Sequence, residues 1–585
     1  GSLAAPVHVL EQRTVGPALG EASITSGILA ALIGTLAVMI IMPLRYGWSG
    51  MLANGMLLCT LSLLMGGMAA LGATLTLPGI AGVVLTIGMA ADSSILTLER
   101  FREEIRMGRS VRAASVTGVR HGILTSIDAD LVTMVSALTL FFLASASVKG
   151  FGLTLALGII CDIVMMLLFK APIIRLLAPK CIAKHPGFWG VKDCKEAAPY
   201  FQGEKPASSR HDVRGRFIKL DINLLGYRKV FLSIAAVAIV LVVALVGMRG
   251  VNFGIEFVGG TSVTFHQGGN DATTEQVRSA FADAGEPDAV VQTTDSDGQA
   301  GFLVRTTDTS AESAAAAANK VADQFGWDAE SFEVTTIGPD WGASVIQSSC
   351  IAFFVSLLLI IAYISVRFRD PKMGVSAVIA LLHDLVIVLG VYVLVGREVT
   401  PNTIAALLTI LGYSLYDTVV VFHRINENMK GDSPKCTFAT MANHSVNEVL
   451  VRSLNTSITS LIPVAAMLIF GGETLRDFAL AMTVGLVCGC YSSYAIATPI
   501  YVMWKTREPQ FAKLQKKYGA EIQRWFLNRL PQAAAGATAA AAGVAADDVA
   551  AGQDAAAAAS QGQQAASKPA KAQNRSKKKR KKVQG

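Results

Sequence analysis

The sequence predicts a polytopic α-helical membrane protein, with about eleven transmembrane helices in two pseudo-symmetric parallel repeats and one small α+β extracytoplasmic domain. Three observations predict this fold class. Of the 585 residues, 52% are hydrophobic and only 16% are charged, whereas soluble proteins are typically about a quarter charged. The apolar residues are gathered into long blocks, and one pattern of residues occurs twice in the same direction.

Each apolar block is long enough to cross a bilayer, whose hydrocarbon core needs ~20 apolar residues per helix. A soluble core is excluded because a helix that is apolar all round has no face to turn to water. The eleven predicted spans are residues 24–44, 51–71, 79–98, 122–144, 150–169, 229–248, 345–366, 374–395, 402–422, 453–470 and 478–503.

Lys and Arg residues in short loops predict the orientation, because such loops stay on the cytoplasmic side. The loop after the third span carries six arginines between Arg100 and Arg120, whereas residues 145–149 on the opposite side contain only Lys149. The arginine-rich side is therefore expected to be cytoplasmic. The N-terminus then starts outside and the C-terminal tail ends inside.

About 95 residues of soluble character lie between the spans that end at 248 and begin at 345, on the outer side. Their alternation of strands and helices favours a small α+β domain of ferredoxin-like type. The predicted order is strand 251–265, helix 274–284, strands within 288–306, helix 311–325 and strand 331–337.

The repeat is visible at two places. GMAADSSILTLER (88–100) matches GYSLYDTVVVFHR (412–424), and GFGLTLALG (150–158) matches DFALAMTVG (477–485). Parallel repeats of this kind are related by an axis along the membrane normal. The second copy has a leading span and an outside domain that the first copy lacks, so we expect these parts to precede residue 1 or to be encoded separately.

Two acids lie inside apolar spans, where an ionised carboxylate costs roughly 2.5–3.5 kcal/mol. Asp92 is in the middle of its span, and Asp417 is five residues before the end of the predicted span 402–422. This places Asp417 ~8 Å from the cytoplasmic boundary. Arg452 enters the next span from the same side, so we expect the two side chains to meet and neutralise each other.

Two interpretations of these charges stay open. One is a structural ion pair that fixes helix register. The other is a proton relay, because burial disfavours the charged carboxylate and a nearby arginine favours it, so the acid can change charge as helices move. Further ionisable residues in or beside spans are either hydrogen-bonded helix contacts or functional groups, with the pair His383–Asp384 the first to test; they are Asp128, Asp130, Asp162, His383 and Asp384.

Other kinds of site have little support in the sequence. The eight cysteines form no disulfide framework, and Cys181, His185 and Cys194 have irregular spacing, so we predict no metal site. We find no G-x-x-x-x-G-K-[ST] phosphate loop and predict neither catalytic residues nor a bound cofactor. The net charge of +8 reflects nine Lys and Arg after residue 567. We expect this tail to lie near anionic lipid or the ribosome.

The motifs resemble the SecD/SecF protein-export family, as a SecD–SecF fusion that lacks the N-terminal SecD span and periplasmic domain. ATLTLPGIAGVVLTIGMAADSSILTLERFREE (73–104) is similar to SecD. GVNFGIEFVGGTSV (250–263), AALLTILGYSLYDTVVVFHRINEN (405–428) and RSLNTSITS (452–460) are similar to SecF. The resemblance covers roughly residues 3–505. Ser93-Ser94 replaces the usual Ala-Asn, and Tyr416 and Asp130 each replace a usual Asn.

The resemblance implies membership of the resistance–nodulation–division superfamily and a role as an accessory subunit of the Sec translocase. Such proteins are not enzymes and associate with the SecYEG channel, SecA and a YajC-like subunit. They couple the proton-motive force to late-stage translocation of preproteins across the bacterial plasma membrane; Na⁺ as coupling ion stays open. The family's intramembrane acids fall on Asp92 and Asp417 and its arginine on Arg452. Gly259 and Gly260 are expected to form a hinge or a plain turn.

The predicted organisation has seven parts. They are a remnant of the SecD extracytoplasmic segment (1–22), a SecD-like membrane half (23–178), a cytoplasmic linker (179–227), the first SecF-like span (228–249), the extracytoplasmic domain (250–343), the SecF-like membrane region (344–505) and a cytoplasmic Ala-rich and Lys/Arg-rich tail (506–585).

Two alternative functions remain at this stage. One is an exporter of lipids or drugs from the same superfamily, although such exporters typically have two large outside domains. The other is a non-transporting scaffold for translocase assembly or membrane insertion. Substitution of Asp92 or Asp417 by Asn separates them, since a scaffold is indifferent to the loss of a titratable acid.

Overall fold

The computed structural model describes residues 11–14, 17–106, 109–190, 222–266, 272–296, 299–307, 310–327, 332–430, 436–519 and 521–522. Much of the predicted linker, most of the predicted tail and Cys194 lie outside the described residues.

Within the described ranges, eleven helices are long and apolar enough to cross a membrane, which confirms the predicted fold class. The first half consists of α1 (Pro17–Tyr46), α2 (Trp48–Ala70), α3 (Leu77–Arg106), α4 (Val111–Leu143), α5 (Ala146–Met165), η1 (Met166–Lys170), α6 (Ala171–Leu177) and η2 (Ala178–Ile182). The second half consists of η3 (Leu225–Tyr227), α9 (Arg228–Arg249), α13 (Pro339–Phe368), α14 (Pro371–Val395), α15 (Pro401–Lys430), α16 (Phe438–Phe470), α17 (Glu473–Ser492), η4 (Ser493–Ala497), α18 (Thr498–Lys505) and α19 (Pro509–Tyr518).

The repeat extends to the lengths of the helices. Helices α3 and α15 each have 30 residues, α4 and α16 each have 33, and α5 and α17 each have 20. Each 20-residue helix continues into a five-residue π-helix, η1 in the first half and η4 in the second. A residue in one half therefore has a defined counterpart in the other, found by counting from the start of the helix.

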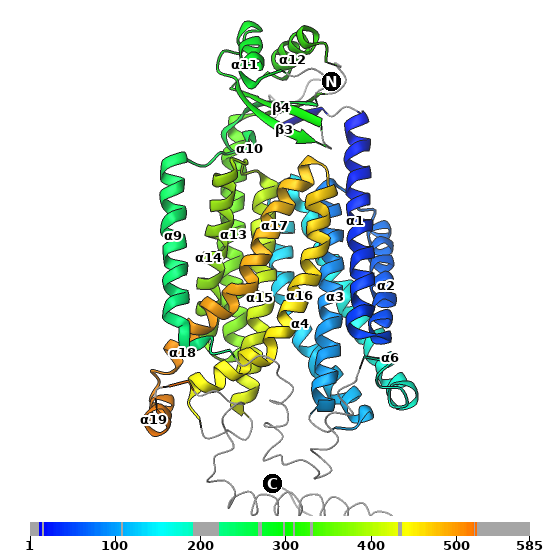
Figure 1. Cartoon of the computed structure of the whole chain (residues 1–585). Helices are drawn as coiled ribbons and strands as arrows, with labels where there is room; N and C mark the ends of the chain where they lie inside the picture. The colour runs from blue at the N-terminus through cyan, green and yellow to red at the C-terminus, as the bar shows by residue number, and fades with distance from the viewer. Residues whose placement is uncertain are drawn as a thin grey trace, which may run out of the picture.

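Several helices continue past their predicted ends, at the end of the bundle away from the small domain (Figure 1). This end is called the distal end. Helix α15 runs to Lys430 and α16 begins at Phe438, whereas the apolar blocks end at 422 and begin at 453. Thirteen residues of α15, roughly 20 Å of helix, therefore follow Asp417, and its distance from the membrane boundary stays a prediction. Charged side chains interrupt the hydropathy signal there but not the helix.

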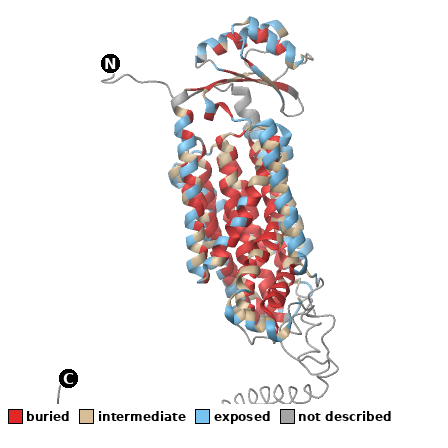
Figure 2. Ribbon diagram, turned by 90° about the vertical axis from the view of Figure 1, so that its left-hand side faces the viewer, coloured by how far each residue is buried: buried red, intermediate tan, exposed pale blue. Residues whose placement is uncertain are grey.

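The two halves share one core. Helix α16 packs against α1 and α3 of the first half, and α15 packs against α4. Gly412 of α15 permits the close approach to α4, since a Cβ at this position would lie 2.8 Å from the Cα of Thr133. Figure 2 shows buried residues along the middle of the bundle and exposed ones on its outside. Helix α9 lies at the edge and packs on α14 (Figure 1).

The small domain lies at one end of the bundle, with α11 (Thr274–Asp283) and α12 (Ala311–Phe325) on the far side of its sheet (Figure 1). The strands are β1 (Glu11–Thr14), β2 (Gly260–His266), β3 (Val290–Ser296), β4 (Gln299–Thr306) and β5 (Phe332–Ile337). They form an antiparallel sheet in the order β1-β5-β2-β4-β3. Phe265 contacts Phe281 and Trp327 in its core.

Two features of this domain differ from the prediction. Strand β1, from the predicted N-terminal remnant, joins the sheet by pairing with β5. The predicted strand 251–265 is divided: Phe253 bridges to Val399, the one-turn helix α10 (Ile255–Val258) follows, and β2 begins only at Gly260.

Gly259 and Gly260 form the turn between α10 and β2. Their φ angles are 77° and 113°, which residues with a Cβ rarely adopt. A Cβ on Gly260 would also lie 2.4 Å from the carbonyl oxygen of Thr306. The turn geometry accounts for both glycines, and a hinge motion at them stays a prediction.

Candidate proton-relay site

Asp92 and Asp417 lie at nearly equivalent heights, as the sixteenth residue of α3 and the seventeenth of α15. Asp92 is 6% exposed, and Asp417 is partly buried. Helices α3 and α15 come from different halves, and both pack against α16. The fold thereby brings the two acids to the interface between the halves.

Hydroxyl groups of α16 hold both acids. Ser457 and Ser460 are three residues apart and so lie on one face of the helix. The Oγ of Ser460 donates a hydrogen bond to Oδ2 of Asp92, and the Oγ of Ser457 donates to Oδ2 of Asp417 at 3.3 Å. One helical turn of the motif RSLNTSITS therefore connects the acid of the first half to the acid of the second.

A cavity of about 20 Å³ lies between these groups. This volume is enough for about one water molecule. The other oxygen of Asp92, Oδ1, is buried and has no hydrogen-bond partner among the described residues. The cavity is lined by Asp92, Tyr413, Ser414, Tyr416, Asp417, Thr456, Ser457, Ser460, Leu486, Gly489 and Cys490.

Arg452 is placed differently from the prediction. It is buried on α16, but among the ion pairs of the described residues its contact is with Glu103 of α3, at 3.8 Å, and not with Asp417. Its charge still acts on Asp417 through space. Because α16 begins at Phe438, Arg452 lies about four helical turns into the helix rather than at its start. Arg452 thus lies between the acids and the distal end.

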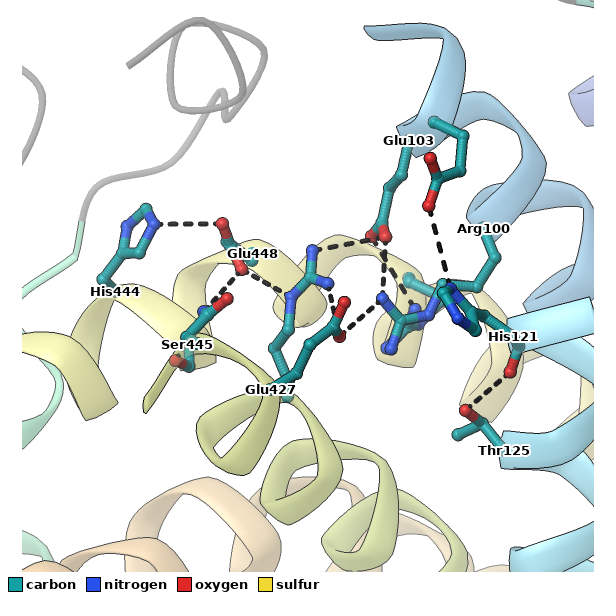
Figure 3. A network of polar contacts seen from close by, with 12 residues as sticks. Arg100, Glu103, His121, Thr125, Glu427, His444, Ser445 and Glu448 are labelled. Carbon is teal, nitrogen blue, oxygen red and sulfur yellow. Dashed lines mark hydrogen bonds and ion pairs between the residues drawn. The ribbon is translucent and has the colours of Figure 1, made fainter. Parts of the chain in front are cut away.

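A group of paired charges closes the distal end of this interface (Figure 3). Arg424 binds Glu103 at 3.2 Å, Glu427 at 3.0 Å and also Glu448. Arg100 binds Glu103 at 3.1 Å and Glu427 at 3.0 Å. His444 lies 3.0 Å from Glu448. We call this group the distal network; it contains Arg100, Glu103, Arg424, Glu427, Glu448 and Arg452.

His383 and Asp384 form a second polar group on α14. The Nδ1 of His383 lies 3.1 Å from Oδ1 of Asp384. Ser414 and Ser492 each donate a hydrogen bond of 2.7 Å to Oδ2 of the same carboxylate. Ser414 also lines the cavity, so one hydroxyl separates Asp384 from the space between Asp92 and Asp417.

Asp128 and Asp130, although close in sequence, have different surroundings. Asp128 accepts two hydrogen bonds from Arg367 of α13, at 2.7 and 2.6 Å, and so forms an ion pair between the halves. Asp130 is 2% exposed and lies near Asp162 and Lys170 inside the first half. Of this pair, only Asp130 belongs to the buried acids around Asp92.

Sequence reasoning missed several of these residues. Lys170 follows directly after the predicted span 150–169, and Arg100 is one of the six arginines expected in the loop after the third span. Ser457 and Ser460 lie in the motif RSLNTSITS, and the sequence predicts no role for them. The pattern that could have identified these two serines is the spacing of hydroxyl side chains along one face of a helix, when the preceding helix carries an intramembrane acid.

The described part of the chain contains no group of three or more His, Cys, Asp and Glu side chains arranged to hold a metal ion. Of the three residues considered for zinc, Cys181 and His185 are described, and Cys194 is not.

Two family models match the chain. The model of the protein export membrane protein SecD/SecF, C-terminal, matches residues 2–180 and 317–507. The model of the SecD/SecF GG motif matches residues 244–266, which include Gly259 and Gly260. The first model covers both membrane halves.

Curated relatives are named as translocase subunits. The protein translocase subunit SecDF of Brucella abortus biovar 1 is 34% identical over 515 residues, which are 87% of this chain and 64% of the relative. SecDF of Thermus thermophilus is 36% identical, over 87% of this chain and 65% of the relative. SecF of Desulfurispirillum indicum is 39% identical, over 49% of this chain and 93% of the relative. The chain spans slightly less than two thirds of the first two relatives.

Two solved structures of SecDF are similar to this chain. The crystal structure of SecDF, a translocon-associated membrane protein, from Thermus thermophilus matches with a TM-score of 0.73 and 34% identity, over 86% of this chain and 66% of that one. SecDF in a super-membrane-facing form matches with a TM-score of 0.65 and 33% identity, over 86% and 65%.

Proposed function

The chain belongs to the SecD/SecF protein-export membrane protein family, and from this premise we propose that it is an accessory subunit of the Sec translocase. In this role it couples the proton-motive force to late-stage translocation of preproteins. The names of the relatives support the translocase assignment. The observation that carries the coupling is that Asp92 and Asp417, from different halves, line one cavity and are joined through Ser460 and Ser457.

A buried acid that gains a proton loses its charge, and with it the penalty for being in a nonpolar medium. Protonation of Asp92 therefore changes the force between the halves, because Asp92 of the first half accepts a hydrogen bond from α16 of the second. Protonation of Asp417 changes the contact of α15 with α16 within the second half. Arg452 responds to the same event, since its charge acts on Asp417 and it also contacts Glu103. Arg452 is thus favoured near Asp417 when that acid is ionised and near Glu103 when it is neutral.

Helix α15 provides a path from Asp417 to the small domain. The segment just before α15 is bonded to the domain: the amide of Val399 donates to Asn252 at 2.8 Å, and the amide of Gly254 donates to Val399 at 2.9 Å. Glu398 also binds Arg305 of β4 at 3.1 Å. A displacement of α15 at Asp417 is transmitted to the domain through these contacts.

The orientation and partners are part of the proposal. The bacterial relatives and the arginines of the distal end support a multi-pass protein of the bacterial plasma membrane, with the distal end in the cytoplasm and the small domain outside. SecYEG, SecA and a YajC-like subunit are the expected partners, and preproteins are the substrates. The proton is the expected coupling ion, and no cofactor is assigned.

The test is export by membrane vesicles that contain the translocase and the full chain, with a preprotein arrested late in translocation. We expect Asp92→Asn and Asp417→Asn each to reduce the completion that depends on the proton-motive force to that of vesicles without the chain. Asp323→Asn, which removes the same charge from an exposed site on α12, serves as the matched control and should behave like the wild type.

Two further measurements complete the test. Co-purification of the translocase with each variant distinguishes lost coupling from lost assembly. Omission of Na⁺ distinguishes the coupling ions. Full stimulation by both Asn variants, with the complex intact, would favour the scaffold function instead. Export of lipids or drugs has no observation in its favour.

A further inference from the structure

Four buried ionisable side chains interact electrostatically inside the first half, and of these only Asp92 also lines the cavity between Asp92 and Asp417. Asp92 is on α3, Asp130 on α4, Asp162 on α5 and Lys170 at the end of η1. Their exposed fractions are 6%, 2%, 4% and 3%. The π-helix η1 turns Lys170 to the interior, whereas its neighbours Leu167 and Leu168 are exposed. Such π-helical segments are frequent at functional sites.

Ser93 connects two of these groups, Lys170 and Asp162. The Nζ of Lys170 donates to the Oγ of Ser93 at 3.3 Å, and Ser93 also shares a hydrogen bond with the Asp162 carboxyl. A hydroxyl has one hydrogen, and the Oγ of Ser93 also lies 3.1 Å from the carbonyl oxygen of Ala90. Ser93 can therefore donate to an ionised Asp162, or donate to Ala90 and accept from a protonated Asp162. The same contact fits both charge states.

The charges of this group do not balance. Three carboxyls lie near one ammonium, and each carboxyl has one buried oxygen without a hydrogen-bond partner among the described residues: Oδ1 of Asp92 and Oδ2 of Asp130 and Asp162. An unpaired buried charge is costly, and a group in this position is neutralised by a proton. The arrangement of lowest cost has one carboxylate paired with Lys170 and the other two carboxyls protonated.

The internal repeat relates the positions of this group to positions around Asp417 in the second half. Ser93 and Asp417 are both the seventeenth residue of their helices, and Asp130 and Ser457 are both the twentieth. Asp162 corresponds in the same way to Gly489, which lines the cavity. The first half therefore has titratable groups at the position where the second half holds Asp417, but with the acids on the neighbouring helices.

We propose that Asp130, Asp162 and Lys170 form a second proton-binding site, at the pseudo-symmetric position of the Asp417 site and coupled electrostatically to Asp92. Like charges cannot accumulate there, so loss of a proton from Asp92 favours uptake of one by Asp130 or Asp162. One proton leaves and one enters, and the net charge of the group is kept. This proposal rests on the proposed function and extends it, because it gives the first half a proton-binding site of its own.

The other titratable groups that face this site come from neighbouring elements. Tyr413 and Tyr416 of α15 interact electrostatically with Asp92, Asp130 and Asp162. Other such contacts are those of Asp417 with Asp92 and of Cys161 with Asp162. Tyr413 donates to the carbonyl oxygen of Leu85 at 2.7 Å, so its proton is held in place.

The test is infrared absorption of protonated carboxyl groups in the full chain, reconstituted in lipid nanodiscs and titrated with pH. We expect Asp130→Asn and Asp162→Asn each to remove protonated-carboxyl signal at neutral pH. Asp128→Asn is the matched control, since Asp128 is two residues from Asp130 but paired with Arg367. It should leave the signal unchanged.

Coupling is measured in two further variants. Lys170→Gln removes the nearby cation and should raise the protonated fraction of the remaining acids at a given pH. Asp92→Asn cannot ionise, so the protonated fraction of Asp130 and Asp162 should no longer rise at the pH at which Asp92 loses its proton in the wild type. A change of about tenfold in proton affinity is expected for the loss of one close charge. If Asp162→Asn does not fold, the double variant Asp162→Asn/Lys170→Gln removes one charge of each sign and keeps the balance.

Unchanged signal in both the Asp130 and the Asp162 variants would overturn the proposal, because it would mean that both acids are permanently ionised. A lost signal that does not respond to Lys170→Gln or Asp92→Asn would overturn the coupling. The measurement needs neither preprotein nor a proton-motive force. Its failure is therefore distinguishable from failure of the export assay with Asp92→Asn and Asp417→Asn.

Discussion

The interface between the two halves has two regions with charged side chains, and they are built differently. In the middle, Asp92 and Asp417 are held by serine hydroxyls beside a cavity. At the distal end, the network around Arg424 places three arginines against three glutamates. A carboxylate paired with arginine keeps its charge, whereas one held by a neutral hydroxyl can exchange a proton. The carboxyl groups of the first region can therefore change their charge, whereas those of the second region keep theirs.

The largest expected effect is on the distal network. Arg424→Ala leaves Glu103, Glu427 and Glu448 without their shared partner. Breaking a buried ion pair from one side costs about 3–5 kcal/mol, so we expect a large fall in the thermal unfolding temperature of the purified chain. Arg278→Ala is the control: Arg278 is half exposed, pairs with Glu275 on the surface, and should change stability little. Wild-type stability of Arg424→Ala would show that the network does not hold the halves together.

An intermediate effect is expected at the junction between the small domain and α15, where Glu398 lies. Burial raises the pKa of Glu398 to about 7, with Glu256 and Asp477 acting in the same direction and Arg305 and Arg397 opposing it. The folded protein then holds a proton that the unfolded chain loses near pH 4.5. The stabilisation is complete below pH 4.5 and is lost as the pH rises through 7; a shift of this size corresponds to about 3 kcal/mol.

Glu398→Gln removes this titration. We expect the unfolding temperature of the wild type, relative to Glu398→Gln, to fall between pH 5 and pH 8. Glu275→Gln, at an exposed position, should follow the wild type at every pH. A difference between wild type and Glu398→Gln that is constant across this range would mean that the acid is ionised throughout and that the junction resembles the distal network.

The smallest effect on stability is expected for the hydroxyl groups of Ser457 and Ser460, which bind Asp417 and Asp92. Ser460→Ala removes one hydrogen bond to Asp92, and Ser457→Ala removes one to Asp417. A hydrogen bond to a charged group is worth about 1.5–3 kcal/mol, so each variant should slow coupled export by about tenfold or more and lower the unfolding temperature less than Arg424→Ala does. Ser62→Ala, whose hydroxyl bonds only within an exposed turn of α2, is the control. The reverse result, lower stability with normal export, would make these serines structural.

Sequence periodicity placed the spans well but not their ends. All eleven helices were predicted, since apolar blocks reveal where a chain meets lipid. The ends of α15 and α16 were missed because the distal network makes these turns polar while the helix continues. Strand β1 was missed for the opposite reason: four residues with no clear pattern become a strand only through the free edge of β5.

The sequence by itself determined the membrane fold and the repeat. It also singled out Asp92, Asp417 and Arg452 as charged residues within apolar spans, because such a charge is costly wherever the helix lies. Only the tertiary structure decided which groups meet. It gave Asp92 the hydroxyl of Ser460, directed Arg452 toward Glu103, and gathered Asp130, Asp162 and Lys170 into one group inside the first half. These contacts join helices far apart in the chain, and their distances follow from how the helices pack rather than from local periodicity.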